Sequence, residues 1–246
     1  MTRTIDVAFL PAEARRADVT VVIDVLRATS TITQAIEAGY RRVLCVDTLE
    51  RARALAAPGR VLAGERHCVR PQGFDLGNSP VETTPPRGDE LVLATTNGAP
   101  AIVRAAALSP IVVIACLRNL DAVTEATPAG DVQLLCAGTD GAPSLEDSYV
   151  AGRIAARLGG RASDSALIAR TLARAYASAR EALAAGAGGH ALAAVDLESD
   201  IAWCAEESVL AVVPTLCETG EGFAIVHDGT QRVSERATGT MQGPPR

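Results

Sequence analysis

The chain has 246 residues, of which 48% are hydrophobic and 21% charged, and a formal net charge of −6. This composition is typical of a globular domain with a sizeable core, and the negative charge argues against binding to nucleic acid. The sequence contains no lysine, which excludes enzymes that form an imine on a lysine amine and NTPases that need a P-loop lysine.

Short apolar runs alternate with helical patterns along the chain. Strands are predicted, in order, at 19–25, 42–46, 60–63, 90–94, 111–115, 132–137 and 221–228. Helices are predicted at 29–38, 99–107, 120–126, 145–158, 164–187 and 196–205, and a further helix is predicted to start at Asp47, with Glu50 at the capping-box position. The alternation indicates an α/β fold, with helices on both faces of a mainly parallel sheet.

The chain shows neither a long linker nor an internal repeat, so we expect one domain over residues 1–228. Within it, the Ala-rich region 164–205 forms either a helical lobe or one layer of the domain. The tail 229–246 is rich in Gly, Pro, Thr and Arg, and we expect it to be partly disordered.

Six cysteines occur and none belongs to a CxxC pair, so a zinc site or a disulfide framework is not expected. The polar N-terminus does not fit a secretion signal, and no apolar run reaches the roughly 20 residues of a membrane span. These features predict a cytoplasmic protein without a membrane partner.

Polar residues that follow the predicted strands are candidates for a site, because ligands of open parallel sheets bind beyond the carboxyl ends of the strands. The first candidates are Asp24, which can hold a hard cation, and Arg27, which can grip an anion with two hydrogen bonds. The alternatives are a buried ion pair between Asp24 and Arg27, or a Ser/Thr cap on the next helix.

Two further segments combine charge with glycine. Glu65 and Arg66 follow the strand at 60–63, and Asn78 lies in the Gly-rich loop 73–80, whose backbone can approach a ligand closely. For this loop, an ordinary surface turn explains the Gly, Asn and Pro residues equally well.

Hydroxyl and amide groups also stand at two predicted helix starts. Thr95, Thr96, Asn97 and Gly98 precede the helix at 99–107, where free N–H groups favour an anion, although Thr96 or Asn97 could serve only as an N-cap. The last segment, 136–147, brings Thr139 and two adjacent acidic residues. Of these, Asp147 fits either a carboxylate at the sheet edge or the capping-box partner of the residue at 144.

Taken together, these segments resemble the 2-phosphosulfolactate phosphatase family over about residues 5–215. The strings that carry the resemblance are VIDVLRATST at 22–31, GER at 64–66, GFDLGNSP at 73–80, TTNG at 95–98, CAGT at 136–139 and SLED at 144–147. Asp200, followed by the Val-Val-Pro at 212–214, is similar to the family's C-terminal pattern. One departure is His67-Cys68, where the family has smaller residues.

The resemblance implies a three-layer α/β/α fold with a mainly parallel or mixed sheet, a requirement for Mg²⁺, and hydrolysis of a phosphate monoester. The expected substrate is a small, highly anionic metabolite, most simply 2-phosphosulfolactate, with sulfolactate as the product on the way to coenzyme M. The departure at His67-Cys68 leaves the detailed identity of the substrate open.

The resemblance also suggests a role for each candidate. The expected catalytic residues are Asp24, Arg27, Glu65 and Arg66. The expected substrate-binding residues are Asn78, Thr95, Thr96, Asn97, Gly98 and Thr139. The expected magnesium ligands are Asp24 and Asp147, with Glu65 as the third choice.

Several alternatives remain open at this point. A metal-activated water is the default nucleophile, and Asp24 as a covalent nucleophile is the competitor. The same residues also fit a metal-dependent lyase or isomerase of a phosphorylated acid, or a non-catalytic anion-binding module. A homodimer is the default assembly, because two-fold symmetry is the commonest.

Overall fold

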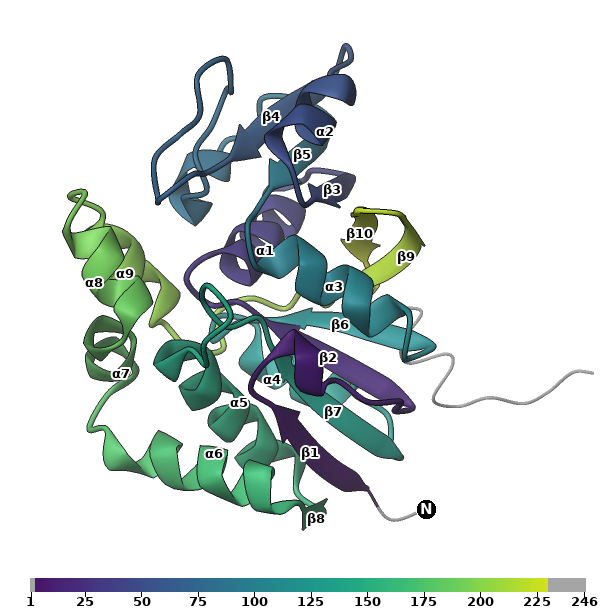
Figure 1. Ribbon diagram of the computed structural model, residues 1–246, viewed down its shortest axis with the longest axis vertical. Coiled ribbons are helices and arrows are strands. Elements are labelled where there is room, and N and C mark those ends of the chain that lie inside the picture. Colours follow the sequence, from purple (N-terminus) through teal and green to yellow (C-terminus); the bar gives the residue numbers. More distant parts are fainter. Residues whose placement is uncertain (1–2, 230–246) are drawn as a thin grey trace, which may run out of the picture.

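The computed structural model describes residues 3–229 and contains ten strands in that part of the chain (Figure 1). The strands are β1 (Thr4–Ala8), β2 (Val19–Ile23), β3 (Arg42–Val46), β4 (Arg60–Gly64), β5 (Glu90–Ala94), β6 (Ile111–Ala115), β7 (Asp131–Cys136), β8 (Arg161–Ala162), β9 (Pro214–Gly220) and β10 (Phe223–Asp228). The predicted disordered tail, 229–246, lies outside the described residues except for Gly229.

All ten strands form one sheet in the order β4-β5-β3-β10-β9-β6-β2-β7-β1-β8. Strands β3, β4 and β5 are parallel to one another, and so are β6, β2, β7, β1 and β8. Between these two groups, β9 and β10 pair with each other and with their neighbours in antiparallel fashion. The sheet is therefore mixed, as one form of the prediction allowed.

The helices cover both faces of this sheet. They are α1 (Ala28–Ala38), α2 (Leu49–Ala54), α3 (Gly98–Ala106), α4 (Leu120–Ala126), α5 (Leu145–Leu158), α6 (Asp164–Ala175), α7 (Ala179–Ala185), α8 (Ala187–Ala193) and α9 (Glu198–Cys204), with short 3₁₀ turns η1 (Pro11–Glu13) and η2 (Pro80–Thr83). A membrane span would need about 20 apolar residues in one helix, and no helix within residues 3–229 meets that requirement.

Successive side chains of β2 point to opposite faces of the sheet, so their contacts show which helices cover each face. All five residues of β2 are buried, because neighbouring strands flank it and helices cover it on both sides. Val22 packs in one cluster with Ile32 of α1, whereas Ile23 packs in the opposite cluster with Leu120 of α4 and Ile154 of α5. The arrangement confirms the three-layer α/β/α fold.

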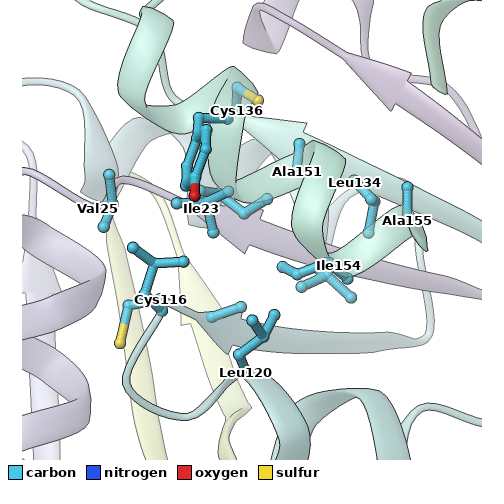
Figure 2. Close-up of a cluster of buried hydrophobic side chains, with 14 of the residues drawn as sticks. Ile23, Val25, Cys116, Leu120, Leu134, Cys136, Ala151, Ile154 and Ala155 are labelled. Atoms are coloured by element: carbon cyan, nitrogen blue, oxygen red, sulfur yellow. The ribbon is translucent and has the colours of Figure 1, made fainter. Parts of the chain in front are cut away.

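Helix α5 packs against β2 and β7 within a cluster of buried hydrophobic side chains, part of which is drawn in Figure 2. Ile23, Leu134 and Ile154 are inaccessible to solvent there, together with Cys136. Burying one such aliphatic side chain stabilises the fold by about 1.5–3 kcal/mol. Because β2 ends inside this rigid layer, the residues that follow it are held firmly.

Two helix starts show how local chemistry sets the boundaries. Thr48, not Asp47, caps α2: its Oγ1 accepts a hydrogen bond from the Arg51 N–H at 3.2 Å. Asp47 instead pairs with the Arg51 guanidinium at 2.6 Å. Ser144 caps α5 as predicted, and its Oγ accepts from the Asp147 N–H at 3.1 Å.

The helical region after β8 is less regular than predicted. The helix predicted at 164–187 is divided, because α6 ends at Ala175, Ser178 caps α7, and α8 starts after the extended Gly186. A Ser side chain that bonds to backbone N–H groups competes with the continuation of a helix. In Figure 1, α6 runs along the sheet edge at β1 and β8, and α7, α8 and α9 form a group at one side of the molecule.

Strands β1, β8 and β9 have no counterpart in the sequence prediction. β9 contains a proline, a glutamate and a glycine, residue types that are depleted in strands, so its strand propensity is low. It forms because it pairs with β10 along its whole length. β1 is only five residues long and obtains its partners, β7 and β8, from distant parts of the chain.

Candidate active site

The carboxyl ends of strands from both parallel groups open into one pocket with a volume of about 300 Å³. Segments that follow β2, β4, β5 and β7 form its walls. Helix α8 also lines it, through Ala187, Gly188, Ala191 and Leu192. The helical region after β8 therefore covers the pocket, at least through α8.

Asp24 directly follows β2 and lies in the pocket wall, with only 8% of its surface exposed. Its Oδ1 accepts a hydrogen bond from the Ala28 N–H, at the first residue of α1, at 3.2 Å. The pKa of Asp24 is raised to about 7, mainly by burial; the carboxylates of Glu65 and Glu146 add to the rise and the Ala28 N–H opposes it. A bound cation would replace the solvation that this carboxylate has lost.

Arg27 pairs with a carboxylate far away in the sequence. Its Nη1 lies 2.7 Å from Oδ2 of Asp200 in α9, and each side chain is 3% exposed. Its Nη2 donates to the carbonyl oxygen of Cys68 at 3.2 Å, and Asp200 Oδ1 accepts from Ser79 Oγ at 2.8 Å. The ion pair considered between Arg27 and Asp24 is therefore not the one that forms.

Glu65 connects two walls of the pocket. Its Oε2 accepts from the Cys68 N–H at 3.1 Å, and its Oε1 accepts from Thr96 Oγ1 at 2.9 Å. The chain turns sharply between these contacts, with φ values of 51° at His67 and 65° at Cys68. Residues other than glycine rarely adopt this left-handed conformation. The turn is held by two hydrogen bonds of Cys68, whose N–H donates to Glu65 and whose carbonyl oxygen accepts from Arg27.

Arg66 lines the same pocket but has a different environment from Arg27. Its Nη1 donates to the carbonyl oxygen of Glu65 at 2.9 Å, and it belongs to none of the ion pairs within residues 3–229. Asp200 neutralises the charge of Arg27, whereas no carboxylate among the described residues does so for Arg66. Arg66 is the stronger candidate for binding an anionic group.

The segment before α3 lines the pocket with Thr95, Thr96 and Asn97. Thr95 Oγ1 accepts from the Ala99 N–H at 2.9 Å, whereas Asn97, at the N-cap position, forms no capping bond with its side chain. Asn97 is thus the N-cap residue by position, but its side chain makes no capping bond, and the Thr96 hydroxyl donates to Glu65 instead. Gly98 begins α3 so close to Asp24 that a Cβ there would lie 2.7 Å from Asp24 Oδ2.

Asp147 and Glu146 lie behind the pocket and are not among its lining residues. Asp147 Oδ1 accepts from the Val25 N–H at 2.9 Å and Oδ2 accepts from the Gly138 N–H at 3.2 Å, so this carboxylate joins the ends of β2 and β7. Burial raises its pKa well above the usual range, and Asp24 and Glu146 add to the effect. Glu146 Oε1 accepts from the Gly188 N–H at 3.1 Å, at the start of α8.

Asn78 and Thr139 complete the polar lining. Asn78 is buried, and its Oδ1 has no hydrogen-bond partner within the described residues. Its backbone oxygen accepts from Thr31 Oγ1 at 2.9 Å, which ties the Gly-rich loop to α1. A buried amide oxygen without a partner is a suitable contact for a ligand, a water or a cation.

The pocket thus collects most of the predicted site residues. Those that line it are Asp24, Arg27, Glu65, Arg66, Asn78, Thr95, Thr96, Asn97 and Thr139. Gly98 touches the pocket indirectly through Asp24, and Asp147 is one layer further back.

A metal site is not complete from protein side chains alone. Within residues 3–229, no three His, Cys, Asp or Glu side chains are arranged to hold a metal ion. The donors present are nevertheless oxygen atoms, from Asp24, Glu65 and the unpartnered Asn78 Oδ1. Mg²⁺ usually takes one or two carboxylates and fills its remaining positions with water and substrate phosphate, so these residues fit Mg²⁺. Asp147 is the least available of the predicted ligands.

Sequence reasoning did not assign three parts of the site. Asp200 was noted without a role, and only the fold places it against Arg27. The lining residues of α8 are Ala, Gly and Leu, which carry no chemical signal in the sequence. Leu26 also lines the pocket and was overlooked because it is apolar.

Comparison with known proteins gives consistent matches. The family described as 2-phosphosulpholactate phosphatase matches residues 7–219. A protein of Deinococcus radiodurans is 41% identical over 210 residues, covering 81% of this chain and 88% of that relative. A protein of Pseudothermotoga lettingae is 37% identical over 217 residues, with coverage of 87% and 96%, and one of Thermus thermophilus is 38% identical over 208 residues, with coverage of 81% and 88%. Each relative is named "Probable 2-phosphosulfolactate phosphatase".

Proposed function

The chain belongs to the 2-phosphosulpholactate phosphatase family, and we propose that it hydrolyses 2-phosphosulfolactate to sulfolactate and inorganic phosphate. As a member of this family it is a phosphoric monoester hydrolase. The observation that carries the proposal is that one pocket contains both the desolvated carboxylate of Asp24 and the guanidinium of Arg66, which forms no ion pair with any other described residue. The guanidinium of Arg66 can bind an anionic phosphoester, and the carboxylate of Asp24 can bind a cation that accompanies the phosphoester.

The charges of the pocket support a requirement for Mg²⁺. The substrate would bring a phosphate, a sulfonate and a carboxylate group. Against these, Arg66 supplies one positive charge, the charge of Arg27 is offset by Asp200, and Asp24 and Glu65 are acidic. The side chains alone therefore leave an excess of negative charge, which a divalent cation on Asp24 and Glu65 would reduce.

The residues of the chain would then divide the work as follows. Bound Mg²⁺ would supply charge stabilisation at the phosphate as its ester bond breaks. Arg66 would hold a phosphate or sulfonate oxygen through charge-assisted hydrogen bonds. Asn78, Thr96 and Asn97 would orient the remaining polar groups of the substrate from the opposite walls.

Two groups could act as the nucleophile that attacks phosphorus. In the first, a water attacks phosphorus and the alkoxide of sulfolactate leaves and takes up a proton. In the second, Asp24 attacks phosphorus and forms an acyl phosphate while the P–O bond to sulfolactate breaks and the leaving alkoxide takes up a proton; water then hydrolyses the acyl phosphate to inorganic phosphate and the free carboxylate. The hydrogen bond from Ala28 and the closeness of Gly98 restrict the movement of Asp24, which favours the first. Trapping phosphate on Asp24 during turnover would establish the second.

The proposal is tested by measuring phosphate release from a panel of phosphorylated hydroxy acids, with Mg²⁺ and with excess EDTA. We expect release from 2-phosphosulfolactate that stops when Mg²⁺ is removed and returns when it is added back. Substrate consumption without phosphate release would indicate the lyase or isomerase alternative. Binding without turnover would indicate an anion-binding module.

Three further points belong to this proposal. We place the protein in the cytoplasm. The physiological reaction would be a step toward coenzyme M. The homodimer stays a prediction, and sedimentation of the purified protein tests it.

A further inference from the structure

We propose that Asp200 is a positioning residue that acts through Arg27, an inference that rests on the phosphatase function proposed above. Asp200 lies in α9, 173 residues from Arg27 in sequence, yet its Oδ2 is 2.7 Å from Arg27 Nη1. The pair is almost completely buried, at 3% exposure for each side chain, so solvent does not weaken it.

The contacts of Arg27 fix its guanidinium from two sides. Nη1 donates to Asp200 and Nη2 donates to the carbonyl oxygen of Cys68. An arginine has five N–H donors in a planar fork, so two contacts define the plane and leave three donors. Because Arg27 lines the pocket, those remaining donors are the ones that a ligand can use.

Asp200 is itself held by a second contact. Its Oδ1 accepts from Ser79 Oγ at 2.8 Å, and Ser79 directly precedes η2. The carboxylate therefore connects three segments around the pocket: the start of α1, the loop that carries Asn78, and α9. In Figure 1, α9 lies beside α8, and α8 lines the pocket. Asp200 thus sets the position of Arg27 relative to both the wall and the covering helices.

Stability alone is a weak explanation for this pair. A buried ion pair often contributes no more stability than apolar residues of similar size would, whereas removing one partner leaves an uncompensated charge. What the pair does provide is a fixed guanidinium at a site that must align a phosphoester. A misplacement of about 1 Å can reduce the rate of an enzyme roughly 100-fold.

The test is a double-mutant cycle with Arg27→Ala, Asp200→Asn and the double variant, read out in two ways. The first readout is kcat for 2-phosphosulfolactate with Mg²⁺. The second is the dissociation constant of inorganic phosphate, from calorimetry in the same buffer, which does not require turnover. We expect Asp200→Asn to reduce kcat about 100-fold and to change phosphate affinity about tenfold when Arg27 is present. In the Arg27→Ala background, we expect the same substitution to change each by less than about twofold.

Two further variants separate a positioning role of Asp200 from a general loss of stability. Ser79→Ala removes only the hydrogen bond to Asp200 Oδ1 and keeps the ion pair. It therefore tests the role of Asp200 even if Asp200→Asn does not fold. We expect Ser79→Ala to lower kcat about threefold when Arg27 is present and to have no such effect in the Arg27→Ala background. Glu90→Gln is the control, because Glu90 is a buried carboxylate paired with arginines outside the pocket. It should lower the unfolding temperature and leave both readouts unchanged.

The outcomes separate the inference from the function on which it rests. Equal effects of Asp200→Asn with and without Arg27, or no effect in either, would overturn the positioning role. Wild-type protein that binds phosphate but releases none from any substrate would overturn the phosphatase function, and the calorimetric cycle would still decide the role of Asp200. Wild-type protein that neither binds phosphate nor releases it from any substrate would overturn both.

Discussion

Gly98 offers a sharp test of the site, because it has no room for a side chain. A Cβ at this position would lie 2.5 Å from Ala28 Cβ and 2.7 Å from Asp24 Oδ2. Two non-bonded carbon atoms need about 3.5–4.0 Å, so the start of α3 and the start of α1 must separate by about 1 Å in Gly98→Ala. Asp24 is attached to the second of these by its hydrogen bond with Ala28.

The expected consequence is a loss of activity larger than the loss of stability. Overpacking of this kind costs about 1–3 kcal/mol in the free energy of unfolding, which a folded domain with several kcal/mol to spare survives. A shift of about 1 Å in a catalytic group costs roughly 100-fold in rate. We therefore expect kcat of Gly98→Ala to fall about 100-fold while the variant still unfolds cooperatively in urea.

Gly88→Ala is the matched control. A Cβ at Gly88 would lie 2.7 Å from the carbonyl oxygen of Gly59, which is comparable crowding, but Gly88 precedes β5 whereas Gly98 follows it. This control should lose stability without losing kcat. Wild-type kcat and Mg²⁺ affinity in Gly98→Ala would refute the placement of Asp24 in the site, and an equal loss of kcat in Gly88→Ala would show that crowding anywhere has the same effect.

Three other predictions follow from charges in the structure. The pKa of Asp24 is raised to about 7, and a cation needs the ionised carboxylate. We therefore expect Mg²⁺ to bind about tenfold more weakly at pH 6 than at pH 8. Equal Mg²⁺ affinities at the two pH values, measured by calorimetry, would exclude Asp24 as a ligand. Arg66→Ala should reduce kcat/KM about 10- to 100-fold through the loss of charge-assisted hydrogen bonds, whereas Arg53→Ala, outside the pocket, should not change it. Burial raises the pKa of Glu90, but its arginine partners more than offset this and lower it to about 2, so Glu90→Gln should cost about 2 kcal/mol in urea unfolding at pH 7. That difference is present above pH 4.5 and should disappear as the pH falls toward 2; a gap that persists at low pH would contradict the assignment.

The strand-end part of the site could be read from the sequence because it depends on local pattern. Each apolar run that forms a buried strand ends where polar residues begin, and Asp24, Glu65 and Thr95 were found by that rule. Periodicity also located most strands and helices, since burial of one face is a local property of the chain. The motifs in these segments carried the family resemblance that the comparisons confirmed.

The hydrogen-bond and ion-pair partners of those residues could not be read from the local sequence. The Thr95 hydroxyl, not the side chain of the N-cap residue Asn97, accepts from the Ala99 N–H in the first turn of α3. Similarly, Asp200 rather than Asp24 pairs with Arg27. Each choice depends on which donor and acceptor the packed helices bring within hydrogen-bond distance. Spacing in the sequence allowed several answers, and burial selected one, because an unpaired buried charge is costly.

The sequence by itself therefore determined which residues end the strands and what chemistry they carry. Only the tertiary structure decided that β9 and β10 separate two parallel groups, that both groups still send their carboxyl ends to one pocket, and that α8 covers it. The physical reason is that strand order and helix placement arise from contacts between segments far apart in the chain, and such contacts leave little trace in the local pattern of apolar and polar residues.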